Sequence, residues 1–125
     1  MTTREELTPW QLEVVEAPVG RRVFLEGVAG TGKTTAGVAR LEHLLRGGTP
    51  ADCLLVLVPQ RTLSQPYSEA LRSPQLPAGG QVATGTLGGI ARRMVDLFWP
   101  LVAEEAGFAD PAKRPTFLTL ETAQY

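Results

Sequence analysis

The sequence predicts an α/β protein in which helices flank a parallel sheet. Three observations support this fold class: a glycine-rich phosphate-loop motif over Gly27–Thr34, a continuous apolar run over Leu54–Val58, and short apolar runs that alternate with helical periodicity. The chain has 125 residues, which is enough for one domain with a hydrophobic core.

Composition narrows the class of protein. Hydrophobic content of 43%, charged content of 20% and a net charge of −1 describe a soluble globular chain without a global basic field. No apolar run approaches the length of a membrane span and no signal-peptide core is present, so we expect a cytoplasmic protein. The single cysteine, Cys53, excludes an internal disulfide and a cysteine-based zinc site, and we expect it to be buried.

The first expected helix runs from Pro9 to about Glu16. Thr8 suits the N-cap, Pro9 the first helical position and Gln11 the third, while Pro18 ends the segment. Gln11 by itself is interpreted as a capping or surface amide. An apolar run over Val23–Glu26 then predicts a short buried strand.

The middle of the chain predicts a helix, a strand and a second helix. Apolar spacing indicates a helix over Thr35–Arg46 that the following glycine pair ends. The continuous apolar run of Leu54–Val58 is typical of a parallel strand covered on both faces. Thr62–Arg72 is expected to be helical, beginning or kinked near Pro66, and Ser73–Gly80 is expected to be a loop.

The remaining residues extend the same alternation. Gln81–Thr86 is expected to be a strand, and a long helix is expected from Ile90 to about Ala106, with a kink at Pro100. Asp110–Pro115 is expected to be a loop. Thr116–Leu120 is either a fourth strand or a linker.

The phosphate-loop motif carries the chemistry of the prediction. Glycines let the backbone curl so that successive N–H groups point at phosphate oxygens, and the following helix adds its positive end. Lys33 would reach the β- and γ-phosphates, and the Thr34 hydroxyl would ligate Mg²⁺, so both are assigned as catalytic. The expected cofactors are ATP and Mg²⁺. The ATP-binding residues in this segment are Gly27, Gly30, Thr31, Gly32, Lys33, Thr34 and Thr35.

Lysine usage strengthens this assignment. The chain has ten arginines but only two lysines, Lys33 and Lys113. A compact ammonium fits among phosphate oxygens where a planar guanidinium does not.

Five stretches resemble superfamily 1 DNA helicases of the UvrD/Rep/PcrA type. Leu7–Gln11 looks like the family's Q-motif, and Gly27–Thr34 matches its phosphate loop closely. The other three, which resemble motif Ia, the V-x-T-[FIL]-H-S-L-A stretch and the segment beyond it, are Leu54–Arg61, Val82–Ala91 and Thr116–Glu121.

This resemblance implies a RecA-like fold and roles for further residues. Gln11 would bind the adenine edge of ATP, and Arg61 and Thr86 would contact the backbone of single-stranded DNA. Gly88 stands where the family has His, and Val58 stands where it has an aromatic residue that supports stacked bases.

The acidic pair that ATP hydrolysis requires is not found in the sequence. Asp52 precedes a predicted strand, Asp96 lies in a predicted helix and Asp110 lies in a loop, so none follows a strand. We therefore expect residues 1–125 to be the N-terminal portion of the ATP-binding domain of an ATP-dependent DNA helicase, which does not turn over ATP alone. A phosphate-loop nucleotide or small-molecule kinase and a non-catalytic nucleotide-binding module are the alternatives.

Overall fold

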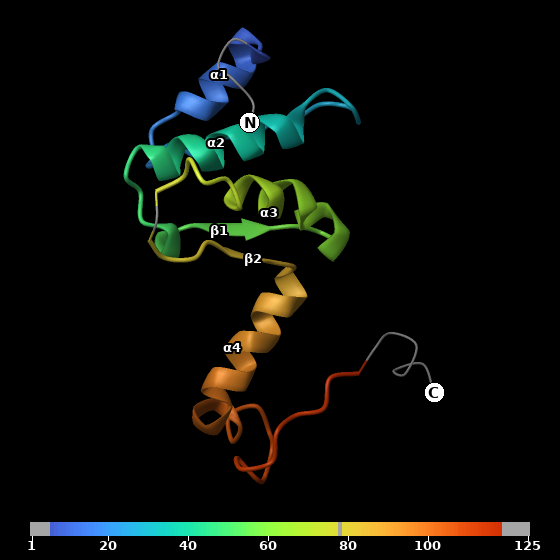
Figure 1. Cartoon of the computed structure of the whole chain (residues 1–125). Helices are drawn as coiled ribbons and strands as arrows, with labels where there is room; N and C mark the ends of the chain where they lie inside the picture. Colours follow the sequence, from blue (N-terminus) through green and yellow to red (C-terminus); the bar gives the residue numbers. More distant parts are fainter. Residues whose placement is uncertain (1–5, 78, 119–125) are drawn as a thin grey trace. The chain divides into compact units, whose positions relative to one another are not determined.

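The computed structural model describes residues 6–77 and 79–118. The chain divides into two compact units, Met1–Thr86 and Leu87–Tyr125. The first contains α1 (Pro9–Glu16), α2 (Lys33–Arg46), β1 (Leu55–Leu57), α3 (Gln65–Leu71) and β2 (Ala83–Gly85), and the second contains α4 (Leu87–Val102) (Figure 1). Short 3-10 helices, η2 (Ala51–Cys53) and η3 (Arg61–Ser64), flank β1 on either side. The chain is therefore a mixed α/β protein.

Helix α1 is held at both ends. At its start, Thr8 N–H donates to Gln11 Oε1 at 2.8 Å and Gln11 N–H donates to Thr8 Oγ1, which forms the expected capping box. At its end, the Arg40 guanidinium of α2 donates to the carbonyls of Val14 and Ala17, each at 2.8 Å. Arg40 thus satisfies carbonyl groups that a helix leaves open at its C-terminus.

The core of the first unit lies between α2, α3 and the strands. A cluster of four buried residues forms its centre, and partly buried side chains that include Val56, Tyr67 and Leu71 pack against it; the four are Leu41, Leu45, Ala51 and Val82. Figure 1 shows α1, α2 and α3 on the same side of the β1–β2 pair.

The sheet is parallel, as predicted, but short. Leu55 pairs with Ala83 and Leu57 with Gly85, and α3 lies in the connection between the strands. The expectation that β1 is covered on both faces is wrong, because Leu55 and Leu57 are 51% and 47% exposed. Helices cover only the face that carries Val56.

The prediction of a strand over Val23–Glu26 is wrong. The segment has no regular structure, and the Phe24 side chain is 90% exposed. A strand needs a neighbour to complete its hydrogen-bond ladder, and the two strands of the described chain pair with each other. The phosphate loop therefore follows an irregular segment.

Two local differences, and one prediction that is confirmed, concern the helices and the cysteine of the first unit. Helix α2 begins at Lys33, two residues before the expected start, and ends at Arg46 as predicted. Helix α3 begins at Gln65 with Pro66 in its first turn, as the proline indicates. Cys53 is exposed rather than buried.

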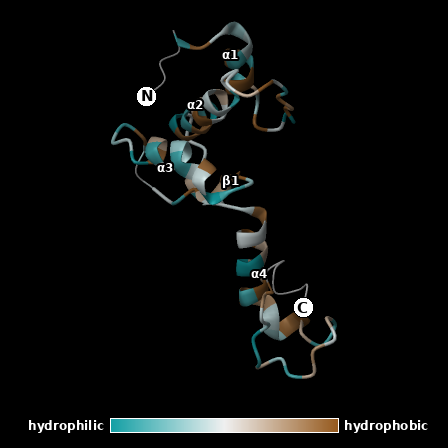
Figure 2. Cartoon of the chain, turned by 90° about the vertical axis from the view of Figure 1, so that its right-hand side faces the viewer, coloured by the Kyte–Doolittle hydropathy of each residue, from teal (hydrophilic) through white to brown (hydrophobic). Residues whose placement is uncertain are grey.

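In the second unit, α4 begins three residues before the expected start and ends at Val102. Pro100 lies inside its last turn. Several apolar side chains of α4 are exposed, and Figure 2 shows hydrophilic and hydrophobic portions along the helix. No helix within residues 6–77 and 79–118 is long and apolar enough to cross a membrane.

The segment after α4 folds back onto the helix through Trp99. This buried side chain donates its Nε1–H to the Lys113 carbonyl at 2.8 Å, and the Phe108 ring meets it edge-on at 4.8 Å. Asp110–Pro115 forms turns and coil, as expected. Residues 116–118 are not a strand, and the rest of Thr116–Leu120 lies outside the described residues.

The contacts of Arg40 predict a stability change. Arg40→Met removes the charged donor from the last turn of α1 and should lower the free energy of unfolding by about 2 kcal/mol, measured by urea denaturation. The matched control is Arg22→Met, which alters an exposed arginine of the same unit and should leave stability within about 0.5 kcal/mol of the wild type. Equal effects of the two variants on the free energy of unfolding would show that the bonds from Arg40 to the α1 carbonyls do not stabilise the fold.

Candidate functional site

The phosphate-loop segment changes backbone handedness twice before α2 begins. Gly30 and Gly32 have φ angles of 82° and 84°, in the left-handed region that glycine adopts without steric cost. Gly32 is the N-cap of α2, and its carbonyl accepts the first helical bond from Ala36 N–H at 3.0 Å. Lys33, Thr34 and Thr35 therefore form the first turn of the helix.

The first turn of α2 presents unpaired backbone donors. No side chain of the described residues caps Gly32, and the N–H groups of the first turn have no acceptor inside the helix. Thr34 and Thr35 are exposed, so solvent reaches this end. Free amides together with the positive helix end fit the oxygens of a phosphate group.

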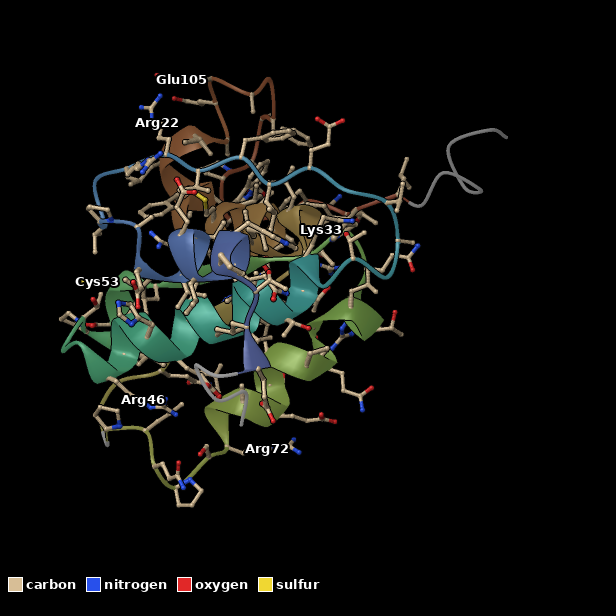
Figure 3. The ribbon with its side chains drawn as sticks, turned by 90° about the horizontal axis from the view of Figure 1, so that it is seen from above. Arg22, Lys33, Arg46, Cys53, Arg72 and Glu105 are labelled. Atoms are coloured by element: carbon tan, nitrogen blue, oxygen red, sulfur yellow. The ribbon has the colours of Figure 1, made fainter. Side chains whose placement is uncertain are left out.

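Hydrogen bonds inside the loop bring Lys33 over it. Thr31 Oγ1 donates to the Val28 carbonyl at 2.8 Å, while Lys33 Nζ donates to the same carbonyl at 2.7 Å and to the Gly27 carbonyl. A Cβ on Gly27 would lie 2.7 Å from Thr31 Oγ1, so glycine permits this close turn. Figure 3 shows Lys33 at the loop end of α2 and Arg46 at the other end. A bound phosphate would compete with these carbonyls for the ammonium.

Gln11 connects α1 to the loop. Its Nε2 donates to the Gly32 carbonyl at 3.2 Å, its Oε1 accepts from Thr8, and the residue is only 6% exposed. A Cβ on Gly32 would lie 2.5 Å from Gln11 Nε2. Gln11 is therefore next to the other ATP-binding candidates, and its contact with adenine stays a prediction.

The two DNA-binding candidates lie at one edge of the sheet. Arg61 opens η3 shortly after β1, and Thr86 directly follows β2. Because the strands are parallel and Val58 N–H extends the ladder to the Gly85 carbonyl at 3.0 Å, both residues leave the same carboxyl edge. Arg61 is exposed and Thr86 is half-buried.

A cavity of about 470 Å³ lies between the carboxyl end of β1 and the first turn of α2. Its lining includes Thr34 from the first turn of α2 and Val58 and Pro59 from the end of β1. The first turn of α2 and the carboxyl end of β1 thus face one space, at the edge where parallel sheets bind ligands.

Sequence reasoning did not single out Glu69, which lines the same cavity as Thr34. Its carboxylate accepts a hydrogen bond from Gln65 Nε2 at 2.8 Å, an i,i+4 pair that looks in the sequence like an ordinary helix-surface contact. Among the residues that the structure describes, no three His, Cys, Asp or Glu side chains gather as a metal site.

Comparisons of the chain with protein-family models, with curated proteins and with solved structures gave no match.

The contact between Gln11 and Gly32 can be isolated by two glycine substitutions. Gly30→Ala places a Cβ in open space and should cost about 1–2 kcal/mol from the left-handed φ alone. Gly32→Ala carries the same strain and also displaces Gln11, so it should cost about 1 kcal/mol more in urea denaturation.

The double variant Gln11→Ala/Gly32→Ala serves as the control. When Gln11 is already alanine, Gly32→Ala should cost only the strain of the left-handed φ, because the clashing amide is gone. An undiminished cost would mean that the two residues do not touch in solution.

Proposed function

We propose that this chain is the ATP-binding part of an ATP-dependent DNA helicase or translocase with a RecA-like fold. The observation that supports it best is the junction at Gly32, where a left-handed glycine leads directly into the exposed, uncapped first turn of α2. That junction, with Lys33 above the loop, has the donors and the charge that a triphosphate requires.

The described residues offer several groups to the phosphates of ATP and one hydroxyl to Mg²⁺. The amides of Lys33, Thr34 and Thr35 and the Lys33 ammonium would hold the β- and γ-phosphates. Mg²⁺ would be held by the Thr34 hydroxyl together with phosphate oxygens and water, which is ordinary coordination for this ion. The cation neutralises phosphate charge when bound. No carboxylate follows β1 or β2 directly within the described residues, so we expect binding without turnover.

The DNA part of the proposal is supported by the shared edge of the sheet. Arg61 and Thr86 follow the carboxyl ends of the paired strands, and Thr62, next to Arg61, lines the cavity that contains Thr34. A DNA strand bound at this edge would therefore lie near the proposed nucleotide site. Nucleotide occupancy and DNA contact could then influence each other, as a translocase requires.

Calorimetric titration with Mg²⁺–ATP tests the nucleotide site. Lys33→Ala should weaken binding roughly tenfold to a hundredfold, because it removes one charge-assisted contact to phosphate. Lys113→Ala, which removes the only other lysine, should bind like the wild type. Equal losses in both variants, or no saturable binding by the folded wild type, would contradict the proposal.

Fluorescence anisotropy with a labelled oligothymidylate tests the DNA edge. Arg61→Ala should bind several-fold more weakly, and the slope of log affinity against log salt should fall by about 0.7. Arg22→Ala provides the matched control. If nucleotide affinity changes neither when DNA is added nor in Arg61→Ala, the result would favour a non-catalytic nucleotide-binding module instead.

A further inference from the structure

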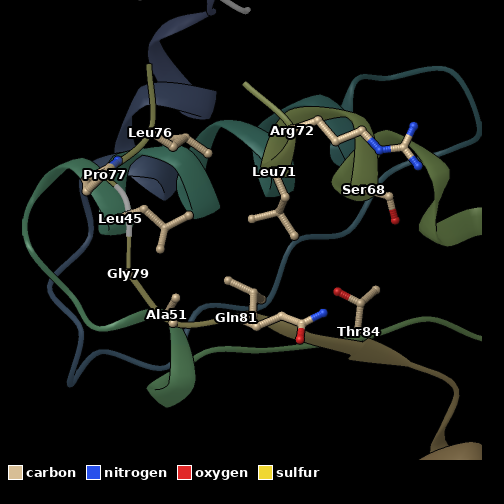
Figure 4. A pocket seen from close by; sticks show the side chains of 12 residues that line it. Leu45, Ala51, Ser68, Leu71, Arg72, Leu76, Pro77, Gly79, Gln81 and Thr84 are labelled. Atoms are coloured by element: carbon tan, nitrogen blue, oxygen red, sulfur yellow. The ribbon is translucent and has the colours of Figure 1, made fainter. Parts of the chain in front are cut away.

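A second cavity, of about 370 Å³, lies between α3 and the beginning of β2 (Figure 4). Leu71 and Ser68 reach into it from α3, and Thr84 reaches into it from β2. Its volume falls within the range of small-molecule sites.

This cavity is separate from the phosphate loop. Its lining includes Ala51 and Gln81, which precede the two strands, whereas the cavity lined by Thr34 lies at the carboxyl end of β1. Leu45 in its wall and Thr34 at the loop are eleven residues apart on α2, or about 16 Å along the helix. The two cavities have no described lining residue in common.

The Thr84 hydroxyl is the first sign of a ligand. Its Oγ1 is buried and has no hydrogen-bond partner. Such atoms are rare because burial without a partner is unfavourable. In Figure 4 this hydroxyl points toward the cavity, and a polar ligand atom would satisfy it once the groups that cover it move aside.

Charge indicates which kind of ligand. Among the described residues of the lining, Arg72 is the only ionisable one, and no carboxylate accompanies it. Its guanidinium forms no hydrogen bond or ion pair within the described part of the chain. Its side chain is exposed and extends along α3 past Ser68 in Figure 4. An anion would therefore be attracted without having to displace a protein partner.

The other end of the cavity is apolar. Leu45, Leu71 and Leu76 line it, opposite the polar side chains of Ser68 and Thr84. A suitable ligand has one anionic, hydrogen-bonding group and a short hydrocarbon body. We propose that this cavity binds a small amphipathic carboxylate, with its headgroup at Arg72 and Thr84 and its hydrocarbon chain against the leucines.

Titration of the full ¹⁵N,¹³C-labelled chain with octanoate tests the site. The expected result is saturable shifts of the Leu45 and Leu71 methyl groups and of the Thr84 amide, while the amides of Gly30–Thr35 stay unmoved. Octan-1-ol, which has no charge, should bind at least about fivefold more weakly than octanoate.

Two variants assign the headgroup contacts. Arg72→Met and Thr84→Val should each weaken octanoate binding at least about fivefold. Arg93→Met, which changes an exposed arginine of the second unit, should bind like the wild type. Any one of three results would overturn the proposal. These are unaltered octanoate affinity in Arg72→Met and Thr84→Val, the absence of saturable shifts, and shifts centred on Gly30–Thr35.

Thermal unfolding without ligand separates binding from folding. Thr84→Val removes a hydroxyl that bonds to nothing, so its melting temperature should equal or exceed that of the wild type. A clear decrease would show that the hydroxyl is already satisfied within the protein, which also overturns the proposal.

Discussion

The change of backbone handedness at Gly32 is the constraint on which the candidate site depends. With φ at 84°, this residue lets an irregular loop enter α2 within one peptide unit, and its carbonyl begins the helical hydrogen bonding. Any other residue would meet a steric cost of about 1–2 kcal/mol there. Because the helix starts at Lys33, the amides of the first turn stay free and the Lys33 side chain reaches back over the loop.

Helix α1 stabilises this arrangement from outside the motif. Gln11 near its start donates to the Gly32 carbonyl, and the end of α1 receives the Arg40 guanidinium of α2. Both contacts join α1 to α2, one at the loop end of α2 and one nearer its middle. Gln11, which resembles an adenine contact in the sequence, thus supports the loop, so its loss would affect loop geometry.

Local signals in the sequence predicted the helices better than the sheet. Thr8 and Gln11 form the expected capping box, Pro66 lies in the first turn of α3, and the order of strands and helices gave the parallel pairing. Val23–Glu26 was predicted incorrectly because apolarity alone does not supply a partner strand. The same limit applies to Leu55 and Leu57, whose burial depends on what covers the second face of the sheet.

In the candidate site, too, local motifs could be predicted from the sequence, whereas contacts between distant segments could not. Motif spacing identified Lys33 and Thr34, whereas the contact of Gln11 with Gly32, 21 residues apart, follows only from the packing of α1 on α2. Glu69 shares a cavity with Thr34 through the position of α3, which no local pattern encodes.

The most direct test of the central claim is a titration of the ¹⁵N-labelled chain with Mg²⁺–ATP, followed through its amide resonances. A phosphate held by the first turn of α2 should produce saturable shifts at Gly30, Gly32 and Lys33–Thr35, and smaller shifts at Gln11. A folded sample in which those resonances do not move at millimolar nucleotide would contradict it.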